Sequence, residues 1–267
     1  MTGQQKPIGV GNKVLFDIVD EHIALITLNR PEKRNAIDAD IAAALGWIVE
    51  EVERNAAVRV AVLRSGNEDF FCAGADLEAI SQGRADELST PNGGFAGLID
   101  ARRAKPWIVA VTGPVLAGGF ELCLACDMIV ASNDARFGLP EVKRGLFAAG
   151  GGAHRLGRWL PRAVTLELLA TGEPIPAERA YSLGLINYMV ARSDLVETAL
   201  ALARTIAANA PRSVIETLNM ARRANEGFDH ELRKESLALA SLLFATEDAA
   251  EGSRAFLEKR KPQWTGR

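Results

Sequence analysis

The chain has 267 residues, of which 48% are hydrophobic and 24% charged, so it can bury one large core. Its net charge of -3 offers no basic field for nucleic acid or an anionic membrane, and we expect neither as a partner. The first residues show no apolar signal segment, no apolar run reaches the roughly 20 residues that span a bilayer, and three cysteines suit a reducing compartment. We therefore expect a cytoplasmic globular protein.

The first part of the chain alternates strand-like and helix-like patterns. Short runs rich in β-branched residues predict strands at 22–28, 58–63, 107–111 and 127–130. Between the first two, apolar residues recur at helical spacing over 41–54, which predicts an amphipathic helix. Such alternation indicates an α/β core.

The later part of the chain is different. From residue 162 onward strand signals nearly vanish, and Ala-, Leu- and Glu-rich stretches are separated by breakers such as Pro174 and Pro211. The expected division is an α/β core at 1–160 and a helical region at 161–267.

Three glycine-bearing turns lie beside acidic residues. They end in Ala-Gly-Ala-Asp76, in Gly118-Gly-Phe-Glu121 and in Gly-Leu-Pro-Glu141. Small residues let a ligand approach backbone N–H groups closely. Each turn taken alone is better explained as a tight turn that needs glycine.

Glu121 is the most informative of these acids. The helix expected after Gly118 is almost wholly apolar over 122–128, so it should be buried. A carboxylate in its first turn must then be hydrogen-bonded, paired or functional. Glu141 follows a proline, a position typical of the first turn of a surface helix.

Cys123 and Cys126 form a C-x-x-C within the same apolar stretch. We interpret them as buried helix residues rather than a redox or metal site, because no second Cys or His pair stands at ligand spacing.

Taken together, the linked turns resemble the enoyl-CoA hydratase (crotonase) family. The resemblance extends over nearly the whole chain, through the segments 28–36, 150–152, 179–185, 244–248 and 255–260. It implies an α/β fold in which a crotonase-like spiral of ββα units (1–160) carries the active site. It also implies that the helical region (161–267) mediates assembly into a homotrimer or a dimer of trimers and supplies part of the CoA site.

The resemblance also implies roles for individual residues. The backbone N–H groups of Ala75 and Gly118 would form an oxyanion hole, and Glu121 and Glu141 would hold one water between them as catalytic acid and base. Residues implied in CoA binding are Lys33, Arg34, Ala36, Ala73, Asp76 and Leu77, with Lys259 near the phosphates.

The sequence departs from the family pattern at two places. Glu78 stands where some hydratases have a lysine for the nucleotide phosphates, and Ala148 and Ala149 stand where many have proline and glycine. The segment 78–96 is expected to be a mobile loop that shapes the acyl pocket.

The expected activity is reversible hydration of a 2-enoyl-CoA to a 3-hydroxyacyl-CoA. CoA enters as part of the substrate, and we expect no metal or redox cofactor. The alternatives left open are hydration of crotonobetainyl-CoA, which in reverse dehydrates carnitinyl-CoA, and migration of the double bond. A more remote alternative is an RNA-binding relative, against which the sequence offers no basic, aromatic surface.

Overall fold

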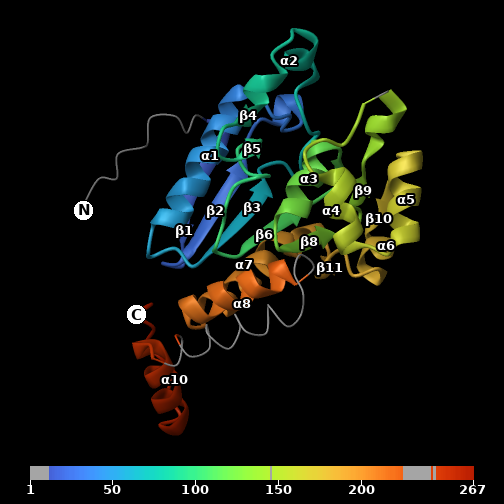
Figure 1. The fold of residues 1–267 in the computed structure, drawn as a ribbon. Coiled ribbons are helices and arrows are strands. Elements are labelled where there is room, and N and C mark those ends of the chain that lie inside the picture. Colours follow the sequence, from blue (N-terminus) through green and yellow to red (C-terminus); the bar gives the residue numbers. More distant parts are fainter. Residues whose placement is uncertain (1–11, 145, 225–241, 243–244) are drawn as a thin grey trace.

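The computed structural model describes residues 12–144, 146–224, 242 and 245–267. Its largest sheet has six strands in the order β1-β2-β3-β6-β8-β11, and all neighbours are parallel except β1 and β2 (Figure 1). The strands are β1 (Val14–Val19), β2 (Ile23–Leu28), β3 (Val60–Ser65), β6 (Trp107–Val111), β8 (Met128–Ser132) and β11 (Tyr188–Val190). The four strands predicted from the sequence are β2, β3, β6 and β8.

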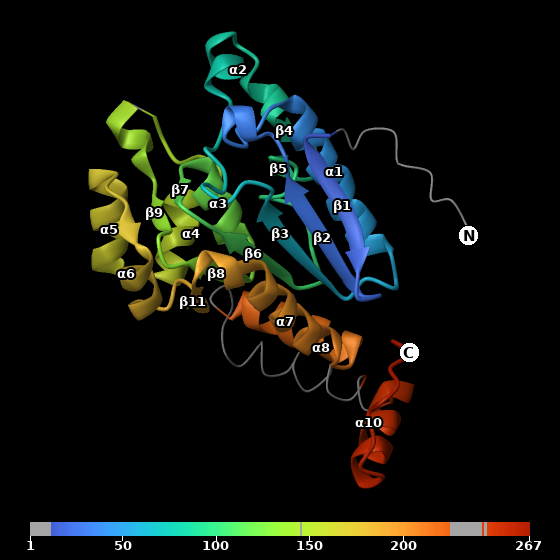
Figure 2. The ribbon, with the colours of Figure 1, turned by 180° about the vertical axis from the view of Figure 1, so that it is seen from behind.

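Helices cover both faces of this sheet (Figures 1 and 2). The predicted amphipathic helix is α1 (Ala39–Arg54), which packs with α3 (Gly118–Ala125) on one side, and α7 (Leu195–Ala207) covers the other. Alternate residues of β3 serve the two layers: Val60 and Val62 pack toward α7, whereas their neighbours pack into the larger core. The strand period of two thus explains why β3 is apolar on both faces from Val60 to Leu63.

A second, smaller layer consists of short strands. It contains β7 (Pro114–Leu116), β9 (Arg136–Gly138) and β10 (Ile175–Pro176) in the order β10-β9-β7. Two single parallel bridges, Cys72 to Val115 and Ile37 to Ala75, extend the same pattern toward the N-terminus.

The chain winds through these layers as a spiral. Each turn passes from a strand of the large sheet to a short segment of the second layer and then into a helix. One turn runs β3, the segment 71–75 and α2 (Leu77–Ser81); the next runs β6, β7 and α3; a third runs β8, β9 and the 3-10 helix η3 (Pro140–Arg144). The α/β fold with a spiral of ββα units is therefore confirmed.

The segment 78–96, expected to be a loop, contains regular structure. After the end of α2 come the 3-10 helix η2 (Ala85–Leu88) and a small hairpin of β4 (Ser89–Thr90) and β5 (Gly94–Phe95). The loop prediction was wrong here because these elements are too short to show a periodic pattern. The remaining elements are η1 (Pro31–Lys33), α4 (Gly152–Trp159), α5 (Arg162–Thr171), α6 (Ala177–Ser182), η4 (Arg192–Asp194), α8 (Pro211–Arg223) and α10 (Glu247–Leu257).

The described residues after 160 are mainly helical, as predicted, but they also contribute to the core. β10 and β11 add strands to the two sheets, and α7 packs on β3, β6 and β8. The sheet thus extends across the expected boundary, and the division into a core and an oligomerisation region stays a prediction. Phe244, in one of the resembling segments, lies outside the described residues. Among the helices of the described ranges, none is long and apolar enough to cross a membrane.

Candidate active site

A cavity of about 1090 Å³ opens beside α2, α3 and η3. Ala75, Gly118, Glu121 and Glu141 all line it. Four positions that lie far apart in the sequence therefore meet at one ligand-sized space.

The spiral explains why these positions meet. Ala75 is the last residue of the second-layer segment of its turn, and Gly118 and Glu141 lie just after the second-layer strands of the next two turns. Parallel pairing aligns these segments: Cys72 lies opposite Val115, and the same register continued places Ala75 opposite Gly118. At that point the two segments diverge, because Gly118 already begins α3.

The hydrogen-bond pattern of a parallel β-bridge explains why the N–H of Ala75 faces the cavity. Ile37 donates its N–H to the Gly74 carbonyl at 2.8 Å and accepts the Asp76 N–H at 2.9 Å. In a parallel bridge of this kind the intervening residue, Ala75, directs its own N–H and C=O to the opposite edge. Its N–H therefore points away from Ile37, toward the edge that Gly118 occupies.

The N–H of Gly118 is available for a different reason. It belongs to the first residue of α3, and the first N–H groups of a helix have no acceptor within the helix. The preceding residue, Ala117, has φ 51° and ψ -131°, a conformation that alanine rarely adopts and that costs about 1–3 kcal/mol. This strained turn directs the start of α3 toward the cavity.

Close approach of the two segments requires glycine at both. Gly74 has φ +89°, and a Cβ there would lie 2.8 Å from the Gly118 nitrogen. A Cβ on Gly118 would lie 2.7 Å from a ring carbon of Phe95, which also lines the cavity. A side chain at Gly74 must shift the Gly118 donor, and one at Gly118 must shift the Phe95 ring or the donor itself.

Glu121 is held by the start of another helix. The residue is only 5% exposed, and its Oε1 accepts a hydrogen bond of 2.9 Å from the N–H of Gly152, the first residue of α4. A Cβ on Gly150 would lie 2.5 Å from Oε2, so this glycine leaves the space that the carboxylate fills. The helix start stabilises the charged carboxylate.

Burial nevertheless raises the pKa of Glu121 from 4.5 to about 7. The N–H groups of Gly152 and Gly150 oppose this rise, the charge of Glu141 adds to it, and Arg155 weakly opposes it. A carboxyl group with a pKa near 7 can both take up and release a proton at neutral pH. The charge of Glu141 contributes because both carboxyl groups line the same cavity.

The residues expected to bind CoA divide into two groups. Arg34, Ala73 and Leu77 line the cavity. The carboxylate of Asp76 is instead engaged by Arg30 and by the N–H groups at the start of α2. Ala36 is buried, with its carbonyl accepting from Arg30.

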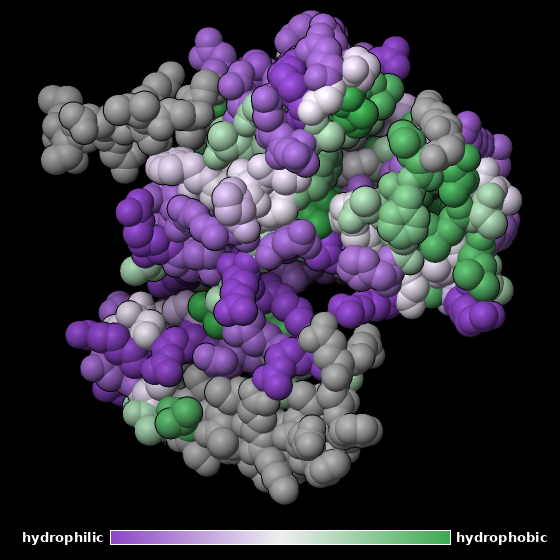
Figure 3. All heavy atoms as spheres, turned by 45° about the horizontal axis from the view of Figure 1, so that its top comes forward, coloured by the Kyte–Doolittle hydropathy of each residue, from purple (hydrophilic) through white to green (hydrophobic). Residues whose placement is uncertain are grey.

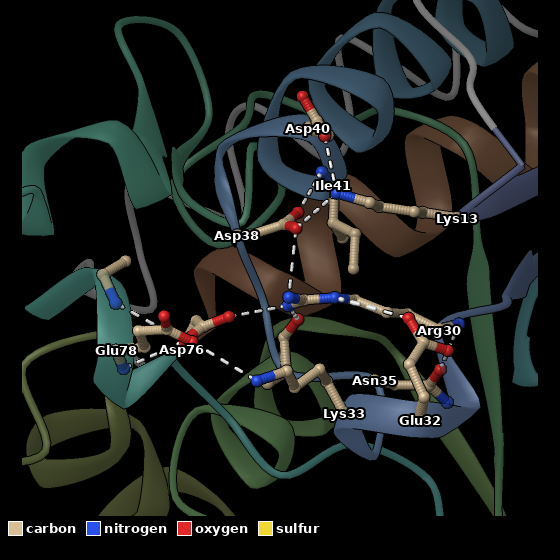
Figure 4. Close-up of polar contacts among 12 residues, drawn as sticks. Lys13, Arg30, Glu32, Lys33, Asn35, Asp38, Asp40, Ile41, Asp76 and Glu78 are labelled. Carbon is tan, nitrogen blue, oxygen red and sulfur yellow. Dashed lines mark hydrogen bonds and ion pairs between the residues drawn. The ribbon is translucent and has the colours of Figure 1, made fainter.

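The two lysines expected at the phosphates lie apart from each other. Lys33 is exposed beside the cavity, and its Nζ lies 3.3 Å from Glu78 Oε2 (Figure 4). Glu78, the residue at which the sequence departs from the family pattern, therefore forms an ion pair with this lysine. Lys259 follows α10, which lies at the opposite end of the molecule from α2 (Figure 1). Within one chain, Lys259 does not reach the cavity.

The structure adds residues to the site to which the sequence had assigned no role. Gly150 and Gly152 belong to a segment recognised only as part of a resemblance. Arg155 bonds the Ile99 carbonyl at 2.9 Å, the Gly150 carbonyl at 3.3 Å and Asp100 Oδ1 at 3.2 Å. It thereby ties the glycine turn that holds Glu121 to a distant part of the chain, a contact with no local sequence signal.

Exposed apolar side chains form the outer rim of the cavity, which we call the mouth. It consists of Leu77 and Ile80 from the α2 turn and Leu146 and Phe147 after η3. Phe147 is 71% exposed. Large apolar groups in such positions are typical of a surface that meets an apolar ligand.

The C-x-x-C cysteines are free thiols buried in and just after α3, as expected. Burial raises the pKa of the Cys126 thiol to about 12, which keeps it protonated and unreactive at neutral pH. Across the described part of the chain, no group of three or more His, Cys, Asp or Glu residues is placed to hold a metal ion.

The fold and the site define an enzyme that places backbone donors and two carboxyl groups around a large ligand cavity. The chain belongs to the enoyl-CoA hydratase/isomerase family, whose sequence model matches residues 19–267.

Known relatives agree with this assignment. The chain is 40% identical over 248 residues to a carnitinyl-CoA dehydratase of Salmonella typhi, covering 91% of this chain and 94% of that one. Its structure resembles an enoyl-CoA hydratase from Mycobacterium tuberculosis H37Rv with a TM-score of 0.91 and 39% identity, covering 96% of this chain and 100% of the other. A carnitinyl-CoA hydratase from Mycobacterium avium matches with a TM-score of 0.76 and 42% identity over the same shares of the two chains.

Proposed function

We propose that this protein is a hydro-lyase that adds water reversibly across the 2,3 double bond of a 2-enoyl-CoA to give a 3-hydroxyacyl-CoA. The observation that carries the proposal is the pairing of Glu121, with its pKa raised to about 7, and Glu141 in a cavity that also contains the Ala75 and Gly118 turns. A double-bond shift needs only one such acid/base group, whereas addition of water makes use of two.

The two backbone donors supply the electrostatic part of the reaction. When a nucleophile adds to the β-carbon of a conjugated thioester, negative charge moves onto the thioester oxygen. Fixed donors aimed at that oxygen stabilise the enolate, and each contributes about 10²–10³ in rate. The N–H groups of Ala75 and Gly118 take this role in the proposal.

The carboxyl groups supply the proton transfers. Glu121, in its ionised form, takes a proton from a water molecule held between the two residues as the hydroxide adds to Cβ. Glu141, in its protonated form, delivers its proton to Cα. The proton that Glu121 took up then restores Glu141, so that one water is added in total and the enzyme returns to its initial state. The pKa of Glu121 suits the first step, because a base works best when its pKa lies near the working pH.

CoA is a part of the substrate in this proposal, and no separate cofactor is needed. Arg34 lines the cavity, and Lys33 lies at its edge beside the Glu78 that partly neutralises it. These two cations are the groups that we assign to the CoA phosphates.

The direct test mixes the protein with crotonyl-CoA and follows the absorbance of the conjugated thioester. We expect that absorbance to fall while 3-hydroxybutyryl-CoA accumulates, and the reverse from the hydroxy ester. Loss of conjugation without a hydroxylated product would indicate double-bond migration, and no turnover of any straight-chain 2-enoyl-CoA would contradict the proposal.

The second candidate substrate is crotonobetainyl-CoA. It is favoured by the 40% identity to a carnitinyl-CoA dehydratase over 91% of the chain. A turnover screen over acyl groups of different length, branching and charge separates the candidates. A kcat/KM at least about tenfold higher for the quaternary ammonium ester, a difference of 1.4 kcal/mol, would replace the plain enoyl ester as the substrate.

We also propose that the protein assembles as a trimer or a dimer of trimers. Apolar surface gathers over the right-hand part of the molecule in Figure 3, which is the side on which α5 lies in Figure 1. Exposed large apolar residues of η3, α5 and α6 are Val142, Leu166 and Tyr181. In an assembly, Lys259 of another copy is the one that could reach the CoA phosphates. Sedimentation velocity tests this, and a monomer at every concentration would contradict it.

A further inference from the structure

Arg30 is a buried cation that the proposed chemistry does not use. It belongs to the segment 28–36, which contributed to the family resemblance without a role of its own. Its side chain is only 11% exposed, so its charge must be compensated by close partners.

The partners of Arg30 lie on both sides of it, as Figure 4 shows. Its Nη1 donates to Asp76 Oδ2 at 2.7 Å and to the carbonyl of Ala36 at 2.9 Å, and lies 3.4 Å from Asp38 Oδ2. Asp38 caps the start of α1 by accepting the N–H of Ile41. The guanidinium group therefore joins the beginning of α1 to the residue that follows Ala75.

Asp76 is fixed at three points. Its N–H donates to Ile37, its Oδ1 accepts the N–H groups of Glu78 and Ala79, and its Oδ2 accepts from Arg30. Burial alone would raise the pKa of Asp76, but the hydrogen bonds from Arg30 and the two backbone groups lower it overall. The carboxylate is thus held as an anion by its surroundings.

The position of Ala75 depends on this arrangement. Gly74, on its N-terminal side, has the conformational freedom of glycine; its carbonyl accepts the Ile37 N–H, and its N–H donates to Cys72 Sγ at 3.3 Å. Asp76, on its C-terminal side, supplies the remaining anchorage. Loss of that anchor lets the peptide at Ala75 rotate and moves its N–H away from the thioester oxygen.

We propose that Arg30 is a positioning residue for the oxyanion hole: it fixes Asp76 and thereby keeps the Ala75 N–H directed at the thioester oxygen. This role rests on the function proposed above. Arginine suits the role because one planar group serves two carboxylates and a carbonyl, which the single ammonium of lysine does with poorer geometry.

The experiment compares Arg30→Gln and Arg30→Lys with a control at the exposed end of the same network. Asp40→Asn removes the 2.6 Å pair with Lys13, and Asp40 is 75% exposed. Turnover of crotonyl-CoA gives kcat and KM. Infrared difference spectra of bound butyryl-CoA labelled with ¹³C at the carbonyl report hydrogen bonding to the thioester oxygen directly.

We expect Arg30→Gln to lower kcat about 10–100-fold, the scale on which misplaced catalytic groups act, with KM changed less than about threefold. The downshift of the carbonyl stretch on binding should shrink in parallel. Arg30→Lys should fall between the wild type and Arg30→Gln on both measures, and Asp40→Asn should match the wild type.

The two readouts separate the possible outcomes. If kcat falls while the carbonyl shift stays at its wild-type value, Arg30 only stabilises the fold and the proposal is wrong. If Arg30→Gln does not fold, the carbonyl shift in Arg30→Lys decides in the same way.

Butyryl-CoA has no double bond, so its spectrum does not depend on hydratase activity. A carbonyl shift that depends on Arg30 in a protein that hydrates no enoyl-CoA would refute the proposed function and keep the positioning role. If the protein hydrates enoyl-CoA but the carbonyl shift does not depend on Arg30, the proposed function stands and the positioning role is refuted.

Discussion

At the reaction centre the chain presents backbone N–H groups and one buried carboxylate from turns rich in glycine, whereas at the mouth of the same cavity it presents exposed apolar side chains. The geometry of the centre is tightly constrained. Glu121 accepts a hydrogen bond from Gly152, and a Cβ on Gly74 or Gly118 would clash with a neighbouring atom. The mouth has no such constraint, since Phe147 is 71% exposed. Substitutions at the centre should therefore change the rate for every substrate, and substitutions at the mouth should change which substrate is preferred.

The largest expected effect comes from removing the charge of a carboxyl group proposed to be catalytic. Glu121→Gln and Glu141→Gln should each lower kcat by about 10²–10⁴-fold, the usual contribution of a general acid or base, with binding of CoA esters retained. Glu167→Gln, at an exposed carboxylate paired with Arg179 on the surface, is the matched control and should leave kcat unchanged. Full activity of both Glu121→Gln and Glu141→Gln would show that the two carboxyl groups have only a structural role.

A methyl group at the proposed oxyanion hole is the next test. Gly118→Ala places a Cβ against Phe95 and should displace one donor, lowering kcat by about 10²–10³-fold. Gly157→Ala adds the same methyl group within α4, where its nearest neighbour would be 3.8 Å away, and should have little effect. If kcat falls equally for short and long acyl groups, the defect lies at the centre. If kcat falls for one chain length only, the contrast between the centre and the mouth is contradicted.

The ionisation of Glu121 predicts a dependence of stability on pH. Its pKa is higher in the fold than the ordinary 4.5, so the fold favours the protonated carboxyl; this contribution is fully present below pH 4.5 and is lost as the pH rises through about 7. A shift of this size corresponds to about 3 kcal/mol. Glu121→Gln has no carboxyl group to ionise, so its free energy of unfolding should not show this loss. The difference in the free energy of unfolding, variant minus wild type, should therefore increase between pH 5 and 8 by up to this amount.

Urea denaturation of both proteins at several pH values measures the effect. A constant difference between them across this range would mean that Glu121 titrates near its ordinary pKa. Activity should rise over the same range if Glu121 acts as the base.

A smaller effect is expected at the mouth. Phe147→Ala should lower kcat/KM about tenfold for a long-chain enoyl-CoA, because a large apolar contact is lost, and less than about twofold for crotonyl-CoA. Turnover of a chain-length series gives this ratio. A uniform loss over the series would show that Phe147 supports the centre rather than selecting the acyl group.

The smallest expected effect concerns Glu78. Its exposed pair with Lys33 is worth about 0–1 kcal/mol, so Glu78→Lys should lower KM for CoA esters only about threefold by freeing that lysine and adding a second cation. The gain should disappear at 0.5 M salt, where exposed charges are screened. A gain that survives high salt would indicate a contact other than charge attraction.

Much of the fold could be predicted because its central elements carry strong apolar patterns. The buried residues of α1 recur at helical spacing, and β2, β3, β6 and β8 are short apolar runs, rich in β-branched residues, that are buried over most of their length. β1 was missed because it is an edge strand with Leu15 and Ile18 exposed, and β11 because it has three residues.

The candidate site was predictable only where local chemistry demanded an explanation. The apolar helix around Glu121 indicated a buried carboxylate, and the structure places it at 5% exposure. The hydrogen bond from Gly152, the anchorage by Arg155 and the direction of the Ala75 N–H depend on which segments lie side by side. No short window of sequence contains that information.

The bridge between Ile37 and Ala75 has a further consequence. The segment 71–75 is in effect an edge strand at its C-terminal end, because the neighbour that pairs with it at Cys72 turns into α3 before it can pair with Ala75. Edge strands expose N–H groups that normally invite another strand. Under the proposed function, the thioester carbonyl would take the place of that missing strand, so that substrate recognition would be a form of strand addition that any acyl group can share.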